Sequence, residues 1–422
     1  MSYSIDDVFG VVRDVPLNYV SRQTVDQLLI DSLSRSKHIV IHGGSKQGKT
    51  CLRKYCLNDD DYIVIQCSNR WSVGDINASI LKRAGFEVTQ SIERSVSGKQ
   101  KLIAKFSAVL LGVGLAADGE QERGTEEKKT LLPLTIDADD VNDLISALDS
   151  IHFRKFIVLE DFHYLSPETQ RDFAIELKAL HEVSSLSVIV VGVWLEENRL
   201  IVYNGDLTGR IIPINADQWA KKDLLSVVTG GERLLNISFD RIFIYELLAK
   251  CFESVSIVQE CCRRACRDAG IFKTQEDQRL VPATKTVDDL VREVVNEQRG
   301  RYRAFITNFA DGFQDTRLEM YRWLLWPILS TDSKVLESGL TYAEIRKSLQ
   351  QHHPSGSDLN PGNITQALQS AASLQVEKNI KPIIIDYDAT TRRLSVVDRG
   401  FLVWLASQDQ QELFECAGLP RE

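Results

Sequence analysis

The chain has 422 residues, of which 43% are apolar and 26% are charged, and its net charge is -9. This length predicts two or three domains, and the apolar content is sufficient for packed cores. The negative net charge argues against a protein that binds nucleic acid mainly by electrostatic attraction, although local basic patches stay open.

The eight cysteines form no CxxC pair, and no histidines stand at zinc-finger spacing. Cys261, Cys262 and Cys266 fall on one amphipathic stretch, where we expect buried free thiols rather than metal ligands. Residues 1–16 have no apolar signal core, and the longest apolar run, residues 106–117, is too short to span a bilayer. We therefore expect a reducing, cytoplasmic setting and no membrane-spanning segment.

The first motif is a phosphate-binding loop between a strand and a helix. Residues 38–42 (HIVIH) have the pattern of a buried strand, and residues 51–57 can continue as a helix. The GxxxxGKT motif between them consists of Gly43, Gly44, Ser45, Lys46, Gln47, Gly48, Lys49 and Thr50. Its glycines let backbone N–H groups face phosphates at a helix N-terminus. We expect Lys49 to reach the β and γ phosphates of ATP and Thr50 to ligate Mg²⁺.

Two further stretches, residues 61–67 and 156–159, have the near-continuous apolar pattern of parallel strands. Glu160 and Asp161 follow the second stretch, at the edge where open α/β sheets bind ligands. One carboxylate there suits Mg²⁺ and the other suits the attacking water. The order is Glu-Asp rather than the Asp-Glu of a Walker B element. Position therefore assigns Glu160 to the metal and Asp161 to the base, whereas chemistry allows the reverse.

The stretch between these motifs is longer than a compact core needs, and the excess lies at about residues 88–135. It holds four basic residues, then the apolar run 106–117 and the polar stretch 119–129; the basic residues are Arg94, Lys99, Lys101 and Lys105. One interpretation is an extra hairpin packed on the core. The alternatives are a contact for a partner or a second subunit, or a membrane contact.

A third buried strand is predicted at residues 186–193 (LSVIVVGV), and a short strand at residues 211–214. Arg210 follows a turn and directly precedes the short strand. An arginine at this place suits a finger that reaches the nucleotide of a neighbouring subunit. A structural arginine in a surface ion pair is the alternative.

Together these motifs resemble the AAA+ ATPases, especially the origin-recognition-type and STAND branches, over about residues 15–270. Residues 18–22 (NYVSR) look like the FVGRE element that lines the adenine, residues 160–165 (EDFHYL) like DEFDxL, and residues 205–210 (GDLTGR) like the arginine-finger segment. The resemblance implies that Val20 and Arg22 help to bind the base and that Arg210 reaches the γ-phosphate of a neighbour. It also implies an α/β fold with a parallel sheet, a helical lid and a C-terminal winged helix.

Two positions depart from this resemblance. Residues 191–194 (VGVW) offer no polar sensor-1 side chain, and Ser256 stands where the lid helix should carry a sensor-2 arginine. Arg263 and Arg264 come two turns later. The missing sensors and the reversed acid pair imply a slow, switch-like ATPase rather than a motor.

The expected domains are a nucleotide-binding domain (1–235), a helical lid (236–283), a helical linker (284–333) and a winged-helix domain (334–422). Thr341 with Glu344 has the spacing of a capping box at the start of a helix. The pattern of the last domain is helix, helix, helix and β-ribbon, with helices at 318–329, 341–351 and 363–376 and strands at 382–387 and 393–397. Residues 287–304 also read as a helix.

The predicted winged helix has few basic residues that could contact the phosphates of DNA. Residues 363–376 are nearly uncharged, and the basic residues nearby are Lys378, Lys381, Arg392 and Arg393. Because phosphate contacts supply much of the affinity for DNA, both double-stranded DNA and protein docking stay open.

The favoured function is a homo-oligomeric Mg-ATP ATPase whose nucleotide state controls a partner protein or nucleic acid. The chain carries no nuclease, TIR or protease signature, so an effector would be encoded separately. Two alternatives remain: a nucleotide-dependent scaffold with negligible turnover, and a winged-helix DNA-binding regulator whose ATPase core is vestigial.

Overall fold

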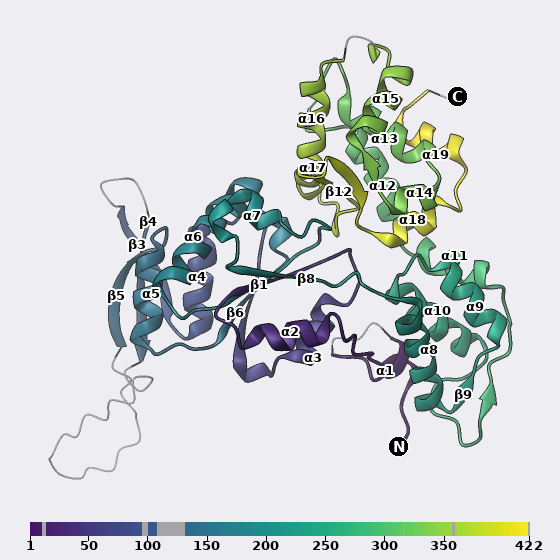
Figure 1. Ribbon diagram of the computed structural model, residues 1–422, viewed down its shortest axis with the longest axis horizontal. Helices are drawn as coiled ribbons and strands as arrows, with labels where there is room; N and C mark the ends of the chain where they lie inside the picture. Colours follow the sequence, from purple (N-terminus) through teal and green to yellow (C-terminus); the bar gives the residue numbers. More distant parts are fainter. Residues whose placement is uncertain (11–13, 95–99, 108–130, 315, 357–358, 421–422) are drawn as a thin grey trace.

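The computed structural model describes residues 1–10, 14–94, 100–107, 131–314, 316–356 and 359–420. A five-stranded parallel sheet lies at the centre of the N-terminal half (Figure 1). Its strands, in their order across the sheet, are β2 (Tyr62–Gln66), β6 (Phe156–Glu160), β7 (Val188–Val191), β1 (His38–His42) and β8 (Ile211–Asn215). The sequence had predicted a strand at each of these five places, and the structure confirms them within a few residues.

Both faces of this sheet are buried. Val40 packs on one side with α4 (Val73–Ala84), α5 (Val141–Ser150) and α6 (Pro167–Val183). Ile39 and Ile41 pack on the other side with α2 (Asp26–Leu33) and α3 (Lys49–Cys56). Because side chains alternate along a strand, a strand covered on both faces must be apolar at every position. This explains the continuous apolar runs in the sequence.

The insertion forms a separate antiparallel sheet at one end of the molecule (Figure 1). Its strands are β3 (Glu87–Arg94), β4 (Gln100–Ser107) and β5 (Leu131–Asp137), so it has three strands rather than a single hairpin. Ala104 and Ile136 are buried against the core formed with α4 and α5. Residues 108–130, which include most of the apolar run and the polar stretch, lie outside the described residues.

A helical region follows the sheet, and the N-terminal helix α1 (Ile5–Phe9) packs into it. The region comprises α1, α8 (Lys221–Leu235), β9 (Ile237–Ser238), α9 (Arg241–Lys250), α10 (Val255–Asp268) and β10 (Arg279–Leu280). Cys261, Cys262 and Cys266 lie on the buried side of α10 as free thiols, as the sequence predicts.

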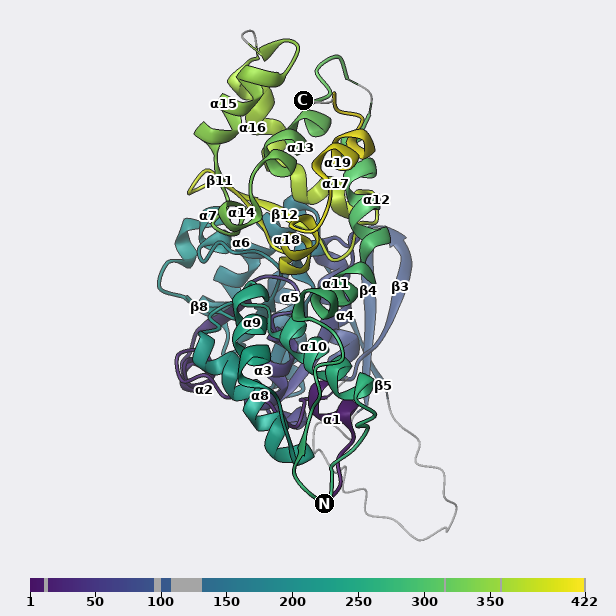
Figure 2. The same cartoon turned by 90° about the vertical axis from the view of Figure 1, so that its right-hand side faces the viewer.

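The last third is helical with a small antiparallel sheet, ordered β11-β13-β12. Its elements are α11 (Val287–Asn296), α12 (Arg299–Ala310), α13 (Met320–Ser330), α14 (Ser333–Glu337), β11 (Leu340–Thr341), α15 (Tyr342–His352), α16 (Pro361–Gln369), α17 (Ala371–Glu377), β12 (Ile385–Asp388), β13 (Arg393–Val396), α18 (Arg399–Leu405) and α19 (Gln410–Ala417). The sheet and helices α13 to α17 give the expected winged-helix arrangement. Figure 2 shows this part stacked at the opposite end of the molecule from the N-terminus.

Details of this part differ from the sequence expectations. The helix predicted at residues 363–376 is two helices, α16 and α17, which meet at Ser370, and the helix predicted at 287–304 is divided into α11 and α12. The capping box of Thr341 and Glu344 is present, with Thr341 Oγ1 accepting the N–H of Glu344. None of the helices within the described ranges is long and apolar enough to cross a membrane.

Candidate functional site

The phosphate loop leaves the carboxyl end of β1 and leads directly into α3. Gly43 has φ +140° and Gly48 has φ +82°, which are backbone conformations that suit glycine. No side chain caps the first turn of α3, because its N-cap residue is Gly48. The free N–H groups of this turn form the kind of cradle that binds phosphate.

Lys49 is the buried cation of the loop. Its Nζ donates to the carbonyl oxygens of Gly43 at 3.1 Å and Gly44 at 2.6 Å. Burial lowers the pKa of Lys49 to about 8, and the carboxylates of Asp217, Glu160 and Asp161 oppose this shift. The three acids therefore help to keep a positive charge beneath the loop, where a triphosphate needs it.

Glu160 and Asp161 stand side by side at the carboxyl end of β6, but their surroundings differ. Glu160 is buried and accepts a hydrogen bond at 2.9 Å from Nε of Arg53 on α3. Burial raises the pKa of Glu160, which Arg53 opposes, and burial also raises the pKa of Asp161, which Lys49 opposes. Asp161 has φ +58°, so the chain turns sharply just after the strand.

A cavity of about 540 Å³ joins these elements. One side of it consists of loop residues and the acid pair, namely Ser45, Lys46, Gln47, Gly48, Lys49, Thr50, Glu160 and Asp161. The other side includes residues of the C-terminal part, among them Pro382, Asp398 and Gly400. Within the described residues no group of three or more His, Cys, Asp or Glu forms a metal site by itself. A Mg²⁺ ion here would depend on phosphate oxygens and on Thr50 and a carboxylate, which is how Mg²⁺ is commonly held with nucleotides.

The two residues expected near the base lie at different depths. Val20 lines the cavity, whereas Arg22 is buried behind Trp219, with its guanidinium 4.1 Å from the indole ring centroid. Nη1 of Arg22 donates to the carbonyl of Ala216 at 2.7 Å. Trp219 itself lines the cavity, and its Nε1 donates to the carbonyl of Gln47 at 3.3 Å. The structure thus connects Arg22 to the cavity only through Trp219, a residue that sequence reasoning missed.

At the two sensor positions the cavity is lined by the residues that the sequence indicated, without the polar or arginine side chain of a sensor. Val191, Gly192 and Val193 line the cavity where sensor 1 would stand, and Ser256 lines it where sensor 2 would stand. Arg263 pairs with Glu260 and Asp6, and Arg264 pairs with Glu293 and Glu297, so both arginines are engaged outside the cavity lining.

Arg210 lies apart from the other predicted site residues. Its carbonyl oxygen accepts the N–H of His38, the first residue of β1, so it stands at the amino end of the strand whose carboxyl end carries the phosphate loop. Its Nη2 pairs with Glu182 at 2.7 Å, and its Nη1 donates to the carbonyl of Asp206. The structure therefore separates Arg210 from the phosphate loop of its own chain.

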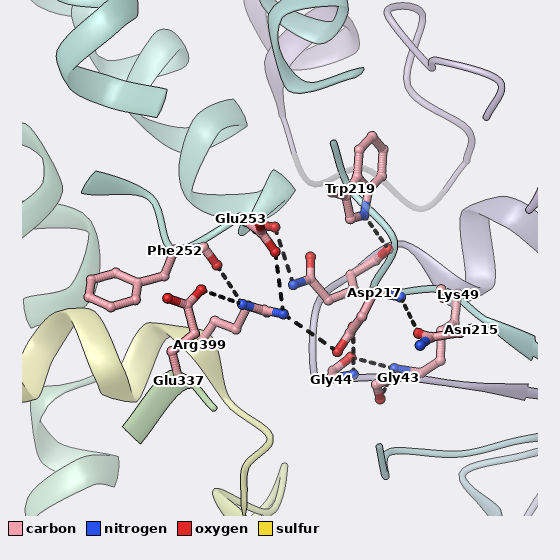
Figure 3. Close-up of polar contacts among 12 residues, drawn as sticks. Gly43, Gly44, Lys49, Asn215, Asp217, Trp219, Phe252, Glu253, Glu337 and Arg399 are labelled. Atoms are coloured by element: carbon pink, nitrogen blue, oxygen red, sulfur yellow. Dashed lines mark hydrogen bonds and ion pairs between the residues drawn. The ribbon is translucent and has the colours of Figure 1, made fainter. Parts of the chain in front are cut away.

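The C-terminal part approaches the tip of the loop, and Figure 3 shows Arg399 joined to Gly44 through Asp217. The N–H of Gly44 donates to Asp217 Oδ1 at 2.7 Å, and the N–H of Ser45 donates to the carbonyl of Val397 at 2.8 Å. Arg399 on α18 lies between Asp217 at 4.0 Å and Glu253 at 3.9 Å. A helix near the C-terminus, the connection between α9 and α10, and the phosphate loop therefore share one polar cluster.

Arg399 makes two closer contacts in the same cluster. Its Nη1 donates to Glu337 at 3.1 Å and to the carbonyl of Phe252 at 3.0 Å (Figure 3). Sequence reasoning missed this arginine, Asp217 and Arg53. Only Arg53 had a local signal, because it stands one helical turn after Lys49.

Comparison with known proteins supports the fold. No protein-family profile matches the chain, and no curated protein matches it in sequence. The structure is similar to that of the Walker-type ATPase of Pyrococcus abyssi, with a TM-score of 0.55 and 11% identity over 94% of this chain and 99% of that one.

Two other solved structures are similar at lower scores. The Orc1 protein of Aeropyrum pernix, solved in complex with DNA, gives a TM-score of 0.45 and 12% identity over 97% of both chains. A STAND protein of Pyrococcus horikoshii with a tetratricopeptide repeat sensor gives 0.38 and 13%, covering 94% of this chain and 44% of that one.

The parallel sheet, the loop at the end of β1 and the similarity to the Walker-type ATPase show the fold of the AAA+ P-loop ATPases.

Proposed function

We propose that this chain is a Mg-ATP-binding ATPase of the AAA+ and STAND-like type that hydrolyses slowly, oligomerises and controls a partner by its nucleotide state. The partner is a protein encoded separately, in the cytoplasm. The observation that carries the proposal is a cavity of about 540 Å³ that both parts of the chain line, because the phosphate loop forms one wall and residues of the C-terminal part form another. A nucleotide in this cavity would contact both parts.

Each residue of the proposed site has a separate role in binding or hydrolysis. Lys49 supplies positive charge to the β and γ phosphates, and the N–H groups of the first turn of α3 hold the phosphate oxygens. Val20 and Trp219 border the base, and Arg22 supports Trp219 from behind. Magnesium, when bound through Thr50 and an acid, neutralises charge on the phosphate oxygens. One acid of the pair Glu160 and Asp161 orients the attacking water.

Oligomerisation is proposed on the position of Arg210. An arginine at the amino end of the sheet cannot reach its own loop at the carboxyl end, so a role in catalysis requires a neighbouring subunit. Its ion pair with Glu182 would have to open, or rearrange, in that assembly.

A scaffold with negligible turnover is the second candidate. The apolar residues Val191 and Val193 at the sensor-1 position favour it, since they offer no polar group to the attacking water or the γ-phosphate. In that case the nucleotide would be held as a structural ligand.

The DNA-binding alternative has less support. Ala372 and Val376 of α17, the second half of the helix expected at residues 363–376, pack toward Val193 and Tyr164 of the nucleotide-binding part, so this half faces the core. Three of the four basic residues named for DNA are engaged within the chain: Lys381 lies over Tyr164, Arg392 over Tyr342, and Arg393 donates to Ser338 and Gly339. DNA binding by α17 would require the C-terminal part to move.

The test is calorimetry of the purified protein with Mg-ATP and Mg-ADP, followed by an ATPase assay with and without double-stranded DNA. We expect binding of Mg-ATP and slow turnover that DNA does not change. Absence of nucleotide binding up to about 1 mM would overturn the proposal, since nucleotide enzymes work below that range. Binding without any turnover would favour the scaffold, and strong stimulation by DNA would favour the regulator.

A further inference from the structure

Arg53 links the phosphate-loop helix to the acid pair. It follows Lys49 by four residues on α3, so both side chains leave the same side of the helix. Its Nε donates to Glu160 Oε1 at 2.9 Å, and the side chains of Arg53 and Glu160 are only 5% and 8% exposed. This pair is therefore a buried contact between α3 and β6.

A second contact fixes the guanidinium. Arg53 lies over the ring of Tyr62 in β2, with 4.7 Å from its Cζ to the ring centroid. β2 neighbours β6 in the sheet, and Tyr62 pairs in register with Phe156. The Tyr62 hydroxyl donates to Asp59 at 2.7 Å, which holds the ring in place. Two adjacent strands thus determine where Arg53 lies.

Asp161, the next residue after Glu160, has a different environment. It is half-buried, lines the same cavity and itself has φ +58°, directly after the end of β6. Across the described part of the chain, no side chain forms an ion pair with its carboxylate, whereas Lys49 and Lys381 act on its charge from a distance. One acid of the pair is therefore neutralised by a buried arginine, and the other is available to the cavity.

We propose that Arg53 is a positioning residue that keeps Glu160 as a fixed, neutralised carboxylate, and that Asp161 serves both the metal and the attacking water. A carboxylate that shares its charge with a buried guanidinium attracts a divalent cation less than one that does not. Separating the buried pair would leave an uncompensated charge, so Glu160 is not readily released. This inference rests on the proposed function.

The hydrolytic step is then assigned to one acid. The water oxygen bonds to the γ-phosphorus, and the bond from that phosphorus to the β–γ bridging oxygen breaks, with its electron pair leaving on ADP. The water proton passes to the Asp161 carboxylate and from there to solvent. Glu160 exchanges no proton in this sequence.

The first experiment compares the double variant Arg53→Met/Glu160→Gln, which removes the whole ion pair and leaves no buried charge, with Asp161→Asn by calorimetry of ATP binding at several Mg²⁺ concentrations. We expect the double variant to keep the apparent Mg²⁺ affinity within about threefold, and Asp161→Asn to lose at least about tenfold, the scale of one charged contact. The reverse ranking would overturn the inference.

The second experiment frees Glu160 from its partner. In Arg53→Met the apparent Mg²⁺ affinity should rise by about tenfold, because a second full charge now faces the cavity. The double variant Arg53→Met/Glu160→Gln should return to the parent's affinity, and Arg53→Lys should stay close to the parent. A purely structural Arg53 would change the unfolding temperature of Arg53→Met but not its Mg²⁺ affinity, and this result would also overturn the inference.

Lys54→Met is the matched control, because Lys54 is the next residue on α3 and pairs with the exposed Asp14 at 3.2 Å. It should leave Mg²⁺ affinity unchanged. If Arg53→Met does not fold, the first experiment still decides the matter. Failure of the parent protein to bind Mg-ATP would refute the proposed function, whereas binding with the reverse ranking of the double variant and Asp161→Asn would refute only this inference.

Discussion

The two edges of the central sheet carry different parts of the proposed chemistry. At the carboxyl edge, the loop after β1, the acids after β6 and Asp217 after β8 meet around one cavity or its loop. At the amino edge, Arg210 and His38 are joined by a backbone hydrogen bond of 3.0 Å.

The length of the strands separates the cavity at the carboxyl edge from Arg210 at the amino edge. β1 has five residues, so its two ends are about 13 Å apart at the usual rise of a strand. An arginine side chain does not bridge that distance. The carboxyl edge can therefore form a binding site within one chain, whereas Arg210 at the amino edge can act only on another chain.

The largest effect is expected at the amino edge. Arg210→Ala should leave Mg-ATP affinity unchanged and lower turnover by about 10³-fold, the scale of an arginine finger. A mixture of Arg210→Ala and Lys49→Ala proteins should recover part of the activity, because one supplies the site and the other supplies the finger. The measurement is the ATPase rate of each protein alone and of the mixture.

Lys178→Ala is the control for Arg210, since Lys178 pairs with Asp206 in the same surface cluster. The ATPase rate and the Mg-ATP affinity of Lys178→Ala should equal those of the parent protein. No recovery in the mixture, together with a parent rate that is independent of protein concentration, would make Arg210 a structural arginine and remove the difference between the edges.

At the carboxyl edge, Lys49→Ala should weaken ATP binding by about 100-fold, because charged hydrogen bonds to phosphate contribute about 1.5–3 kcal/mol. Calorimetry measures the dissociation constant, and Lys54→Ala on the same helix serves as the comparison. Tight ATP binding by Lys49→Ala would contradict the assignment of the loop.

The free energy of unfolding should depend on pH through one buried histidine at each edge of the sheet. Burial lowers the pKa of His38 and of His42, at the two ends of β1, to about 4. Because the unfolded chain takes up these protons near pH 6.5, the stabilisation is complete above that pH and is lost as the pH falls toward 4. Each histidine should contribute a slope of about 1.4 kcal/mol per pH unit in that window.

His38→Gln should therefore reduce the pH dependence of the free energy of unfolding between pH 6 and pH 4.5, as measured by denaturant titration at each pH. His152→Gln, a change at an exposed loop position, should leave the slope as in the parent. Equal slopes for the parent and His38→Gln would show that His38 does not control acid stability.

The smallest effect concerns the contact between the carboxyl edge and the C-terminal part. Arg399→Gln leaves Asp217, Glu253 and Glu337 without their shared cation, so we expect ATP binding to weaken by about threefold through added negative charge near the loop. Arg303→Gln, which removes an exposed pair with Glu412, is the control. Tighter ATP binding by Arg399→Gln would show that this cluster opposes the nucleotide.

The fold was largely predictable because its signals are local. Residues 38–50 specify strand, loop and helix within thirteen positions, and the acids of the second motif stand directly after an apolar strand. The capping box of Thr341 was likewise readable from a spacing of three residues. The break at Ser370 was not, because residues 363–376 contain no glycine or proline and helix propensity alone does not mark two helices there.

The sequence by itself therefore determined the phosphate loop, the place of the acid pair and the AAA+ type of fold, since each depends on neighbours along the chain. Only the tertiary structure decided which acid pairs with an arginine, which aromatic residue lines the cavity beside Arg22 and which segments contact the loop. Arg53 and Glu160 are 107 positions apart, and Gly44 and Asp217 are 173 apart. Contacts at such separations depend on how strands and helices pack, and packing is a property of the whole core.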